Sequence, residues 1–419
     1  MISAFSTALS GLNADSSAID VVGNDLANLN TTGYKANEID FSDLMAQQLG
    51  VSSTSGQLGM GVGQVTAVSE YTQGTLETTN GPTDAAIQGN GFFVVANQNN
   101  QTLYTRDGSF QINSSGQLVD GSGDLVQGWT ATNGTVNTNG AIGAIQVPVG
   151  ANIAATPTTT MSFALNLDAT PSTTATPATF SAPIQVVDSE GTSHTLTATF
   201  TNTGTDTWSY NLTIPATDLS GGGTTPATVA SGTLTFDSSG QLTTPAQSSD
   251  PQPVSITGLA DGAANMSIGW NLYGASGSSS ITQYAEASAV SGTTQNGFAA
   301  GSINSVSLQN GGLLVATYSN GQQVTAGQLA VAAISNPDSL TSVGNNNLAA
   351  SATTATPAIG AANTGSRGQI VAGALESSTV DIAQEFTNLL SFERSYQANS
   401  RVITTADQLL QETLNLVHA

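Results

Sequence analysis

The 419-residue chain carries 5 basic against 28 acidic residues and a formal net charge of −23 at pH 7. Such an acidic excess repels a polyphosphate backbone, and the scattered basic residues form no stripe, so nucleic-acid binding is excluded. The absence of cysteine excludes disulfides, iron–sulfur clusters and thiolate zinc sites, and it suits a bacterial protein that works outside the cell.

The first 30 residues predict an amphipathic helix. Large apolar side chains recur at spacings of three and four, and the series slips by one residue after Ile19. The predicted seam is Phe5, Leu9, Leu12, Ile19, Val22, Leu26 and Leu29.

The first 30 residues lack the basic and continuous apolar regions of a Sec signal. No run in the chain reaches the roughly 18 apolar residues of a membrane span, so we expect no membrane insertion.

The stretch "GNDLANLNTTGYK", residues 23–35, predicts where this helix ends. Gly33 can adopt the left-handed conformation that terminates a helix, and the asparagines and threonines before it favour turns. Lys35 follows the carboxyl end, where the helix dipole favours a cation. A plain solvated lysine is the alternative at that position.

Beyond an irregular connector at residues 31–74, the apolar period changes from about 3.6 to 2, which predicts antiparallel β structure. The predicted strands are 91–96, 103–113, 145–149, 184–188, 194–201, 208–214, 232–236, 265–273, 302–308 and 313–319. A similar turn follows three of them, and each requires a positive φ at its glycine, Gly116, Gly240 or Gly321.

Linker-like segments at 151–160 and 274–280 bracket one block of strands and predict a nested organisation. We expect a discontinuous inner β domain at 75–150 and 285–370, interrupted by an outer β domain at 151–284. The terminal helical domain would comprise 1–30 and 371–419. The predicted fold class is therefore α+β, with paired, coiled-coil-like terminal helices and two mainly antiparallel β domains, one inserted in the other.

The carboxyl-terminal segment predicts a second helix with heptad spacing. Its predicted apolar seam is Ile382, Phe386, Leu389, Tyr396, Ile403, Leu410, Leu414 and Val417. Ser378 and Asp381 are spaced as a capping box, which predicts a helix start at Ser378. Because both seams run past the length that a β domain covers, the two helices are expected to pair with each other and with other subunits.

The sequence motifs that could indicate catalysis, metal binding or phosphate binding are weak. His194 lies near Ser193 and Asp188, yet no nucleophile elbow surrounds it, so an exposed strand histidine is expected. Asp120, Ser122 and Asp124 alternate as in a calcium loop, but the bidentate glutamate is missing and a hairpin turn is favoured. The glycine-rich stretch 59–65 lacks the lysine of a phosphate loop. We therefore expect no catalytic residue, no cofactor and no metal site.

Both ends of the chain resemble a known family. "ALSGLNADSSAIDVVGNDLANLNTTGYK", residues 8–35, is similar to the amino-terminal signature of the bacterial flagellar rod and hook proteins, and residues 373–416 resemble the carboxyl-terminal one. The matching positions include Asn24, Asn28, Gly33, Tyr34, Lys35, Arg394, Tyr396 and Asn399. The total length and the inserted block resemble the hook members more than the shorter rod members.

The resemblance implies a non-enzymatic subunit that is exported unfolded by the flagellar type III apparatus. It would polymerise in many copies into a flexible tube outside the cell, the hook, which transmits motor torque to the filament. Its implied neighbours are the rod, the hook cap and the hook–filament junction proteins. A distal rod or hook-associated axial protein, a secreted β-rich adhesin and an exported glycan hydrolase remain alternatives.

Overall fold

The computed structural model describes residues 2–44, 47–48, 57–170 and 177–417. The chain divides into two units. The helix-bearing unit comprises Met1–Val149, Ser305–Thr317 and Gln323–Ala419, and the inserted unit comprises Gly150–Asn304 and Tyr318–Gln322. None of the helices in the described part of the chain is long and apolar enough to cross a membrane.

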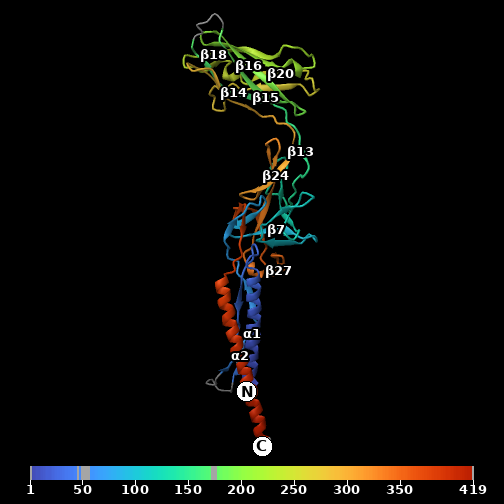
Figure 1. Cartoon of the computed structure of the whole chain (residues 1–419), viewed down its shortest axis with the longest axis vertical. Helices are drawn as coiled ribbons and strands as arrows, with labels where there is room; N and C mark the ends of the chain where they lie inside the picture. The colour runs from blue at the N-terminus through green and yellow to red at the C-terminus, as the bar shows by residue number, and fades with distance from the viewer. Residues whose placement is uncertain (1, 45–46, 49–56, 171–176, 418–419) are drawn as a thin grey trace. The chain divides into compact units, whose positions relative to one another are not determined.

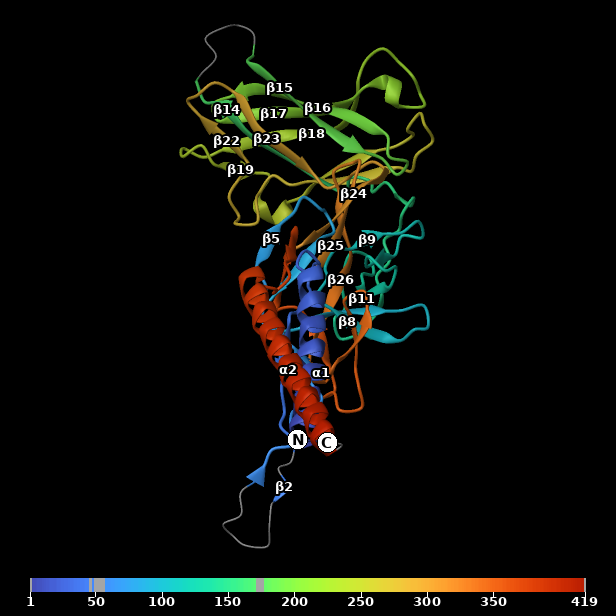
Figure 2. The same ribbon diagram turned by 60° about the horizontal axis from the view of Figure 1, so that its bottom comes forward.

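The two ends of the chain form the α-helices of the described residues, α1 at Ile2–Ala27 and α2 at Ile382–Val417. They pack along each other, as Figures 1 and 2 show. The pairing of the terminal helices and the mainly antiparallel sheets confirm the predicted fold class.

The largest sheet of the helix-bearing unit is antiparallel, and β7 lies in its interior. Every residue of β7, Phe92–Ala96, is buried, and the strand pairs with β8, β11 and β26. The strands of this region are β5 (Leu76–Thr78), β6 (Ala85–Gln88), β8 (Thr102–Thr105), β9 (Gln111–Ile112), β10 (Leu118–Val119), β11 (Leu125–Thr130), β12 (Gly143–Ala144), β24 (Gly301–Gln309), β25 (Leu313–Tyr318), β26 (Gln323–Ala333), β27 (Thr341–Gly344), β28 (Asn347–Ala349), β29 (Ala358–Ala361), β30 (Gln369–Ala372) and β31 (Ala374–Glu376), with a 3₁₀ turn at Pro337–Ser339.

Two short strand pairs bring the last strands before α2 to the first strands of the β region. β30 pairs with β6, and β31 pairs with β5. The segment that leads into α2 is therefore held by strands from the amino-terminal half of the chain.

The connector is more regular than we predicted. β1, Asn37–Asp40, pairs with β4, Thr66–Ser69, and β2, Gln47–Gln48, pairs with β3, Gln57–Leu58. The strands were missed because each is at most four residues long and rich in polar side chains, so the apolar alternation that marks a strand is weak.

The inserted unit is a two-sheet sandwich, whose layers are visible in Figure 2. One sheet contains β14 (Thr160–Asp168), β20 (Gln252–Ile256), β21 (Met266–Trp270), β22 (Ile281–Tyr284) and β23 (Ala289–Gln295). The other contains β15 (Thr179–Val187), β16 (Ser193–Gly204), β17 (Thr207–Ile214), β18 (Ala227–Phe236) and β19 (Leu242–Thr244). Trp270 packs edge-on against Phe163 and Tyr210 in a continuous apolar core. β13 (Asn152–Ile153) and 3₁₀ turns at Ala216–Asp218 and Gln247–Ser249 complete this unit.

The inserted unit extends past residue 284, where we placed its end. β23 pairs with β14 from Ala289 to Gln295, with one register shift, and so belongs to the inserted sheet. All residues of β23 are exposed, which means that the strand carries no apolar alternation from which it could have been predicted.

Most predicted strands appear in the structure, and Gly116, Gly240 and Gly321 have φ of 79°, 75° and 81°, as the turn prediction required. The strand predicted at 145–149 forms only in part: β12 lies just before it, and within it Gln146 makes an isolated β-bridge with Gln117. Pro148 lacks the N–H that a strand interior needs.

Candidate functional site

Helix α1 faces α2 through a row of small residues. Ala8, Gly11, Ala18 and Val22 lie on this face at heptad spacing, and Ala8, Ala18 and Val22 are buried. A Cβ added at Gly11 would lie 2.7 Å from Nδ2 of Asn399 on α2, so the glycine permits the close approach of the two helices.

A polar contact fixes the register of this pairing. Nδ2 of Asn399 donates a 2.9 Å hydrogen bond to Oδ2 of Asp15, a buried residue on α1. Burial raises the pKa of Asp15, and the hydrogen bond from Asn399 opposes that rise. Because a buried carboxylate without a partner is costly, sliding either helix past the other would be penalised.

The predicted seam of α1 is therefore only partly the one that α2 covers. Val22 is buried, whereas Phe5 and Leu9 are exposed. The half-buried members are Leu12, Ile19, Leu26 and Leu29. We placed the seam on the largest side chains, but the close pairing with α2 selects the neighbouring face of alanine and glycine.

In α2, the predicted residues divide in the same way. Leu389, Ile403 and Leu410 are half-buried, whereas Ile382, Phe386 and Tyr396 are exposed. The side chains of Leu414 and Val417 lie outside the described residues. Phe392, which we did not predict, packs against Phe41 with 5.8 Å between the ring centroids.

The start of α2 also differs from the prediction. Asp381 accepts hydrogen bonds from the backbone N–H groups of Ala383 and Gln384 and caps the helix, which begins at Ile382. Ser378 accepts only from Val380, before the helix. An aspartate at the N-cap also carries the negative charge that the helix amino terminus favours, which explains the later start.

At the end of α1, four polar residues form a closed cluster. Tyr34 donates a 2.7 Å hydrogen bond to Oδ1 of the buried Asp25. Asn24 donates to the hydroxyl of Tyr34. The backbone N–H of Asn37 donates to Oδ2 of Asp25. Burial and the neighbouring Asp25 carboxylate raise the pKa of Tyr34, so the hydroxyl stays protonated and remains a donor.

The turn after α1 follows the prediction for Gly33, whose φ is 68°. Its backbone N–H donates to the carbonyl of Glu376, and a Cβ would lie 2.7 Å from the backbone of Arg106. Asn28 supports the turn by accepting a hydrogen bond from the hydroxyl of Thr31. A side chain at residue 33 would clash with the β region, so the glycine is needed for packing as well as for conformation.

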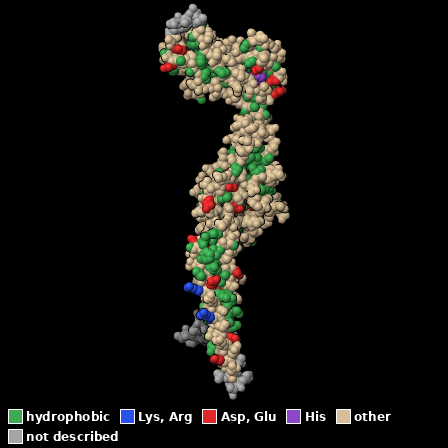
Figure 3. Space-filling model, in the orientation of Figure 1, with side chains coloured by type: hydrophobic (Ala, Val, Ile, Leu, Met, Phe, Trp, Pro, Cys, Tyr) green, Lys and Arg blue, Asp and Glu red, His purple; other side chains and the backbone are tan. Residues whose placement is uncertain are grey.

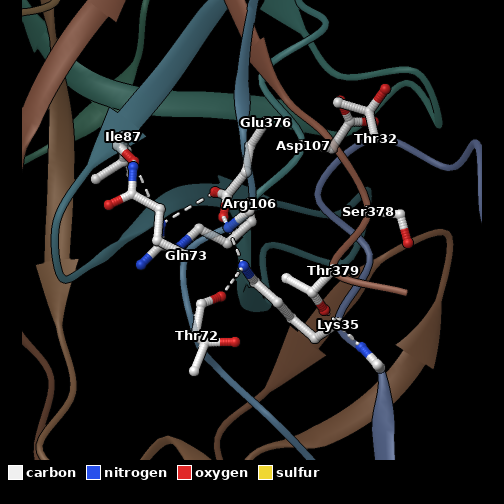
Figure 4. Close-up of polar contacts among 12 residues, drawn as sticks. Thr32, Lys35, Thr72, Gln73, Ile87, Arg106, Asp107, Glu376, Ser378 and Thr379 are labelled. Atoms are coloured by element: carbon white, nitrogen blue, oxygen red, sulfur yellow. Dashed lines mark hydrogen bonds and ion pairs between the residues drawn. The ribbon is translucent and has the colours of Figure 1, made fainter. Parts of the chain in front are cut away.

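Lys35 is not solvated, and its main partner is not the helix dipole. Its ammonium donates to Oε1 of Glu376 at 2.5 Å and to the carbonyl of Thr72 at 2.6 Å. Arg106 donates to Oε2 of the same glutamate at 3.1 Å and to the carbonyl of Gly89. Figure 4 shows Lys35, Arg106 and Glu376 converging; we refer to these three residues as the basal charge cluster.

The basal charge cluster is buried. Glu376 has no exposed surface, and Lys35 and Arg106 are buried. Burial lowers the pKa of Lys35, and the hydrogen bond and charge of Glu376 oppose this shift. Because the three residues come from the connector, the β region and the segment before α2, the cluster ties both helix ends to one point.

The remaining signature residues have different surroundings. Arg394 and Tyr396 lie on exposed positions of α2. Sequence reasoning missed Asp25 and Arg106 as structural partners. Arg106 offered a usable signal, since it is one of only five basic residues in an acidic chain.

The structure also places the side chains that we considered as catalytic or metal-binding candidates. His194 is 4% exposed, so the expectation of an exposed strand histidine was wrong. It occupies an inward position of the β16 alternation, where carboxylates surround it. Asp120 accepts hydrogen bonds from Ser122 and from the backbone of Asp124, as in the predicted hairpin turn between β10 and β11.

Large apolar side chains remain exposed on the outer faces of the paired helices. In Figure 3 hydrophobic side chains gather along the two helices. The exposed members are Phe5, Leu9, Ile382, Phe386, Leu390, Tyr396, Val402 and Leu409, of which Phe386 is 52% exposed. A two-helix pair that has already buried its own seam has no internal use for this surface, so it is available to other chains.

Four family models match along the chain. The amino terminus matches a flagella basal body rod protein model at residues 5–35, and residues 86–162 match the D1 domain of the flagellar hook protein FlgE/F/G. The D2 domain of flagellar basal body protein FlaE matches residues 152–298, and the carboxyl-terminal model of the rod FlgEFG proteins matches residues 371–416.

Curated relatives match over nearly the whole length. The chain is 32% identical to the flagellar hook protein FlgE of Salmonella typhimurium over 98% of this chain and 99% of the relative. It is also 32% identical to FlgE of Escherichia coli, over 99% of this chain and 100% of the relative. A crystal structure of Helicobacter pylori flagellar hook protein FlgE2 aligns with a TM-score of 0.48 at 12% identity, covering 65% of this chain and 93% of that one. The chain belongs to the flagellar hook protein family.

Proposed function

We propose that this chain is the structural subunit of a bacterial flagellar hook. Many copies polymerise outside the cell into a flexible tube that transmits torque from the motor to the filament. The protein catalyses no reaction in this role. The observation that carries the proposal is the apolar surface left on the outside of the paired helices.

That surface is expected for the subunit of a helical polymer and not for a monomeric protein. The small-residue seam already satisfies the contact between α1 and α2, yet side chains as large as Phe5, Phe386 and Leu409 remain in solvent. Burying a side chain of this size contributes about 1.5–3 kcal/mol. Lateral packing of helix pairs from neighbouring subunits would bury these side chains in a closed inner layer, with the β regions outside.

The same role defines the partners. One end of such a tube joins the flagellar rod and the other joins the hook–filament junction proteins, while a hook cap guides subunit addition. The type III export apparatus would deliver the unfolded chain. A distal rod or hook-associated axial protein of the same family is the second candidate, since the helix pair would serve there too.

Substitution on the outer helix face tests the proposal. We expect Phe386→Ser to abolish tube formation by concentrated protein, because it removes an exposed apolar side chain from the proposed contact, while leaving the monomer folded. Electron microscopy after salting out measures the tubes. Val149→Ser is the matched control, since Val149 is about as exposed, at 56%, but belongs to a turn and to neither helix. Tubes of normal yield from Phe386→Ser would refute the helix-layer role.

Ionic strength should also control assembly. Subunits with a formal charge of −23 repel one another, and salt shortens the range of that repulsion. We therefore expect light scattering to report faster polymerisation as salt is added. Rates that do not depend on ionic strength would mean that the acidic residues lie away from subunit contacts.

An adhesin or a glycan hydrolase fits less well. Neither needs large apolar side chains along paired terminal helices. An adhesin would form no tubes at high concentration, and a hydrolase would release soluble sugar from cell-wall material.

A further inference from the structure

Three carboxylates converge on the one buried histidine within the inserted unit. Nε2 of His194 lies 3.1 Å from Oδ2 of Asp188 and 3.6 Å from Oδ2 of Asp261, and Nδ1 lies 3.1 Å from Oδ2 of Asp218. Asp188 has no exposed surface, and the side chains of Asp218 and Asp261 are each 25% exposed. Neither the hook role nor the helix pairing uses these residues.

We propose that His194, Asp188 and Asp261 form a binding site for a divalent transition-metal ion, with Zn²⁺ as its natural probe. Among the described residues, these three offer ligand atoms that all lie within 4.8 Å of one another. Ligands at about 2.1 Å around a tetrahedral zinc ion are about 3.4 Å apart. The spacings of 3.1 and 3.6 Å from Nε2 to the two carboxylate oxygens bracket that value.

The surroundings hold each ligand in a metal-binding orientation. A histidine that binds a metal through one ring nitrogen usually donates its other N–H to a carboxylate, which fixes the tautomer. Asp218 occupies that position at Nδ1, leaving Nε2 as the free ligand. Oδ1 of Asp188 accepts backbone hydrogen bonds from Glu190, Gly191 and Thr192, so its Oδ2 is the oxygen turned toward the site.

The donor set selects the class of ion. Calcium and magnesium take oxygen ligands, whereas an imidazole with two carboxylates suits zinc and its transition-metal neighbours. Three protein ligands leave a fourth position for water, and the partial exposure of Asp261 provides a path from solvent.

The site would link the two sheets of the sandwich. Asp188 and His194 belong to the turn between β15 and β16 and to β16 itself, in one sheet. Asp261 lies between β20 and β21 of the other sheet. A bound ion would therefore cross-link the loops at one end of the inserted unit.

The same geometry could instead hold a protonated histidine. Burial alone would lower the pKa of His194, but hydrogen bonds and charge from Asp218 and Asp188 outweigh burial and raise it. An imidazolium would donate from both ring nitrogens, and no metal would bind. Zinc titration separates the two states, since only a metal site gives saturable binding.

The experiment is isothermal titration of the metal-stripped full chain with Zn²⁺ at mildly alkaline pH. We expect one ion per chain, with affinity reduced by about 10- to 100-fold in Asp218→Asn, which loses the orienting carboxylate, and by at least as much in Asp261→Asn. Both substitutions are partly exposed and should fold, which circular dichroism checks. His418→Gln removes the other histidine and should bind as the wild type does. Absence of saturable binding, or binding retained by both aspartate variants, would overturn the proposal.

Discussion

Replacing Glu376 with glutamine should destabilise the helix-bearing unit by about 3–5 kcal/mol, because it leaves two buried cations without their common counter-charge. Glu376 is the one carboxylate that contacts both Lys35 and Arg106 in the basal charge cluster. It also accepts a hydrogen bond from the backbone of Gly74, so its loss affects the irregular segment that leads into β5.

Native-state hydrogen exchange measures this effect, since it resolves the two units of the chain separately. Amides of β6 and β7 should lose protection, whereas amides of the inserted unit supply an internal reference. Glu77→Gln is the matched control, because Glu77 is exposed on β5 and its substitution should change stability by less than about 0.5 kcal/mol.

Lys35→Met provides a further comparison within the cluster. It leaves the ion pair of Arg106 and Glu376, which has no net charge, intact. The loss of unfolding free energy should therefore be smaller than that caused by Glu376→Gln. Equal losses from the two variants would mean that packing, and not charge balance, dominates at this position.

Local chemistry predicted the two helices and the turn that follows α1. The existence of α1 and α2 and the turn at Gly33 follow from short-range periodicity and from the conformational freedom of glycine. The turn glycines between strands were predictable for the same reason. Such features depend on residues within a few positions of one another, which a sequence displays directly.

The face of α1 that meets α2 was harder to place, because the largest apolar side chains dominate the periodic pattern. Phe5 and Leu9 dominate the periodic signal, yet they are exposed, whereas Gly11 lies against Asn399 of α2, on the helix face that carries the buried Ala8 and Ala18. Small residues contribute little hydrophobicity but permit the closest approach. A helix with two functional faces gives two overlapping patterns, and the larger side chains hide the smaller ones.

The pairing of Lys35 with Glu376 and the approach of Asp218 and Asp261 to His194 could not be predicted from the sequence. Lys35 and Glu376 are separated by 341 positions, and no local pattern relates them. Asp188, Asp218 and Asp261 approach His194 from loops of two different sheets. Pairings of this kind depend on the topology, which is settled only when the whole chain folds.

The small-residue seam leads to the second large effect, which compares two glycines of α1. A leucine at Gly11 should destabilise the helix pair by about 1–3 kcal/mol, as overpacking of a closed contact does. Its Cβ alone would meet Asn399 Nδ2 at 2.7 Å. Asn399 would have to move, which would break its hydrogen bond to Asp15 and leave that buried carboxylate without its partner.

Gly23→Leu is the control, because nothing lies within 4 Å of a Cβ placed there. Both substitutions replace a helix glycine and gain about 0.5–1 kcal/mol of helix propensity, so propensity cancels in the comparison. Thermal unfolding followed by the helical circular dichroism signal should therefore place Gly11→Leu below the wild type and Gly23→Leu at or above it. If the two variants melted together, α1 and α2 would not be in close contact in solution. In that case the exposed residues Phe5 and Phe386 would no longer be the surface left over from a completed pair, and the helix-layer role would lose its structural basis.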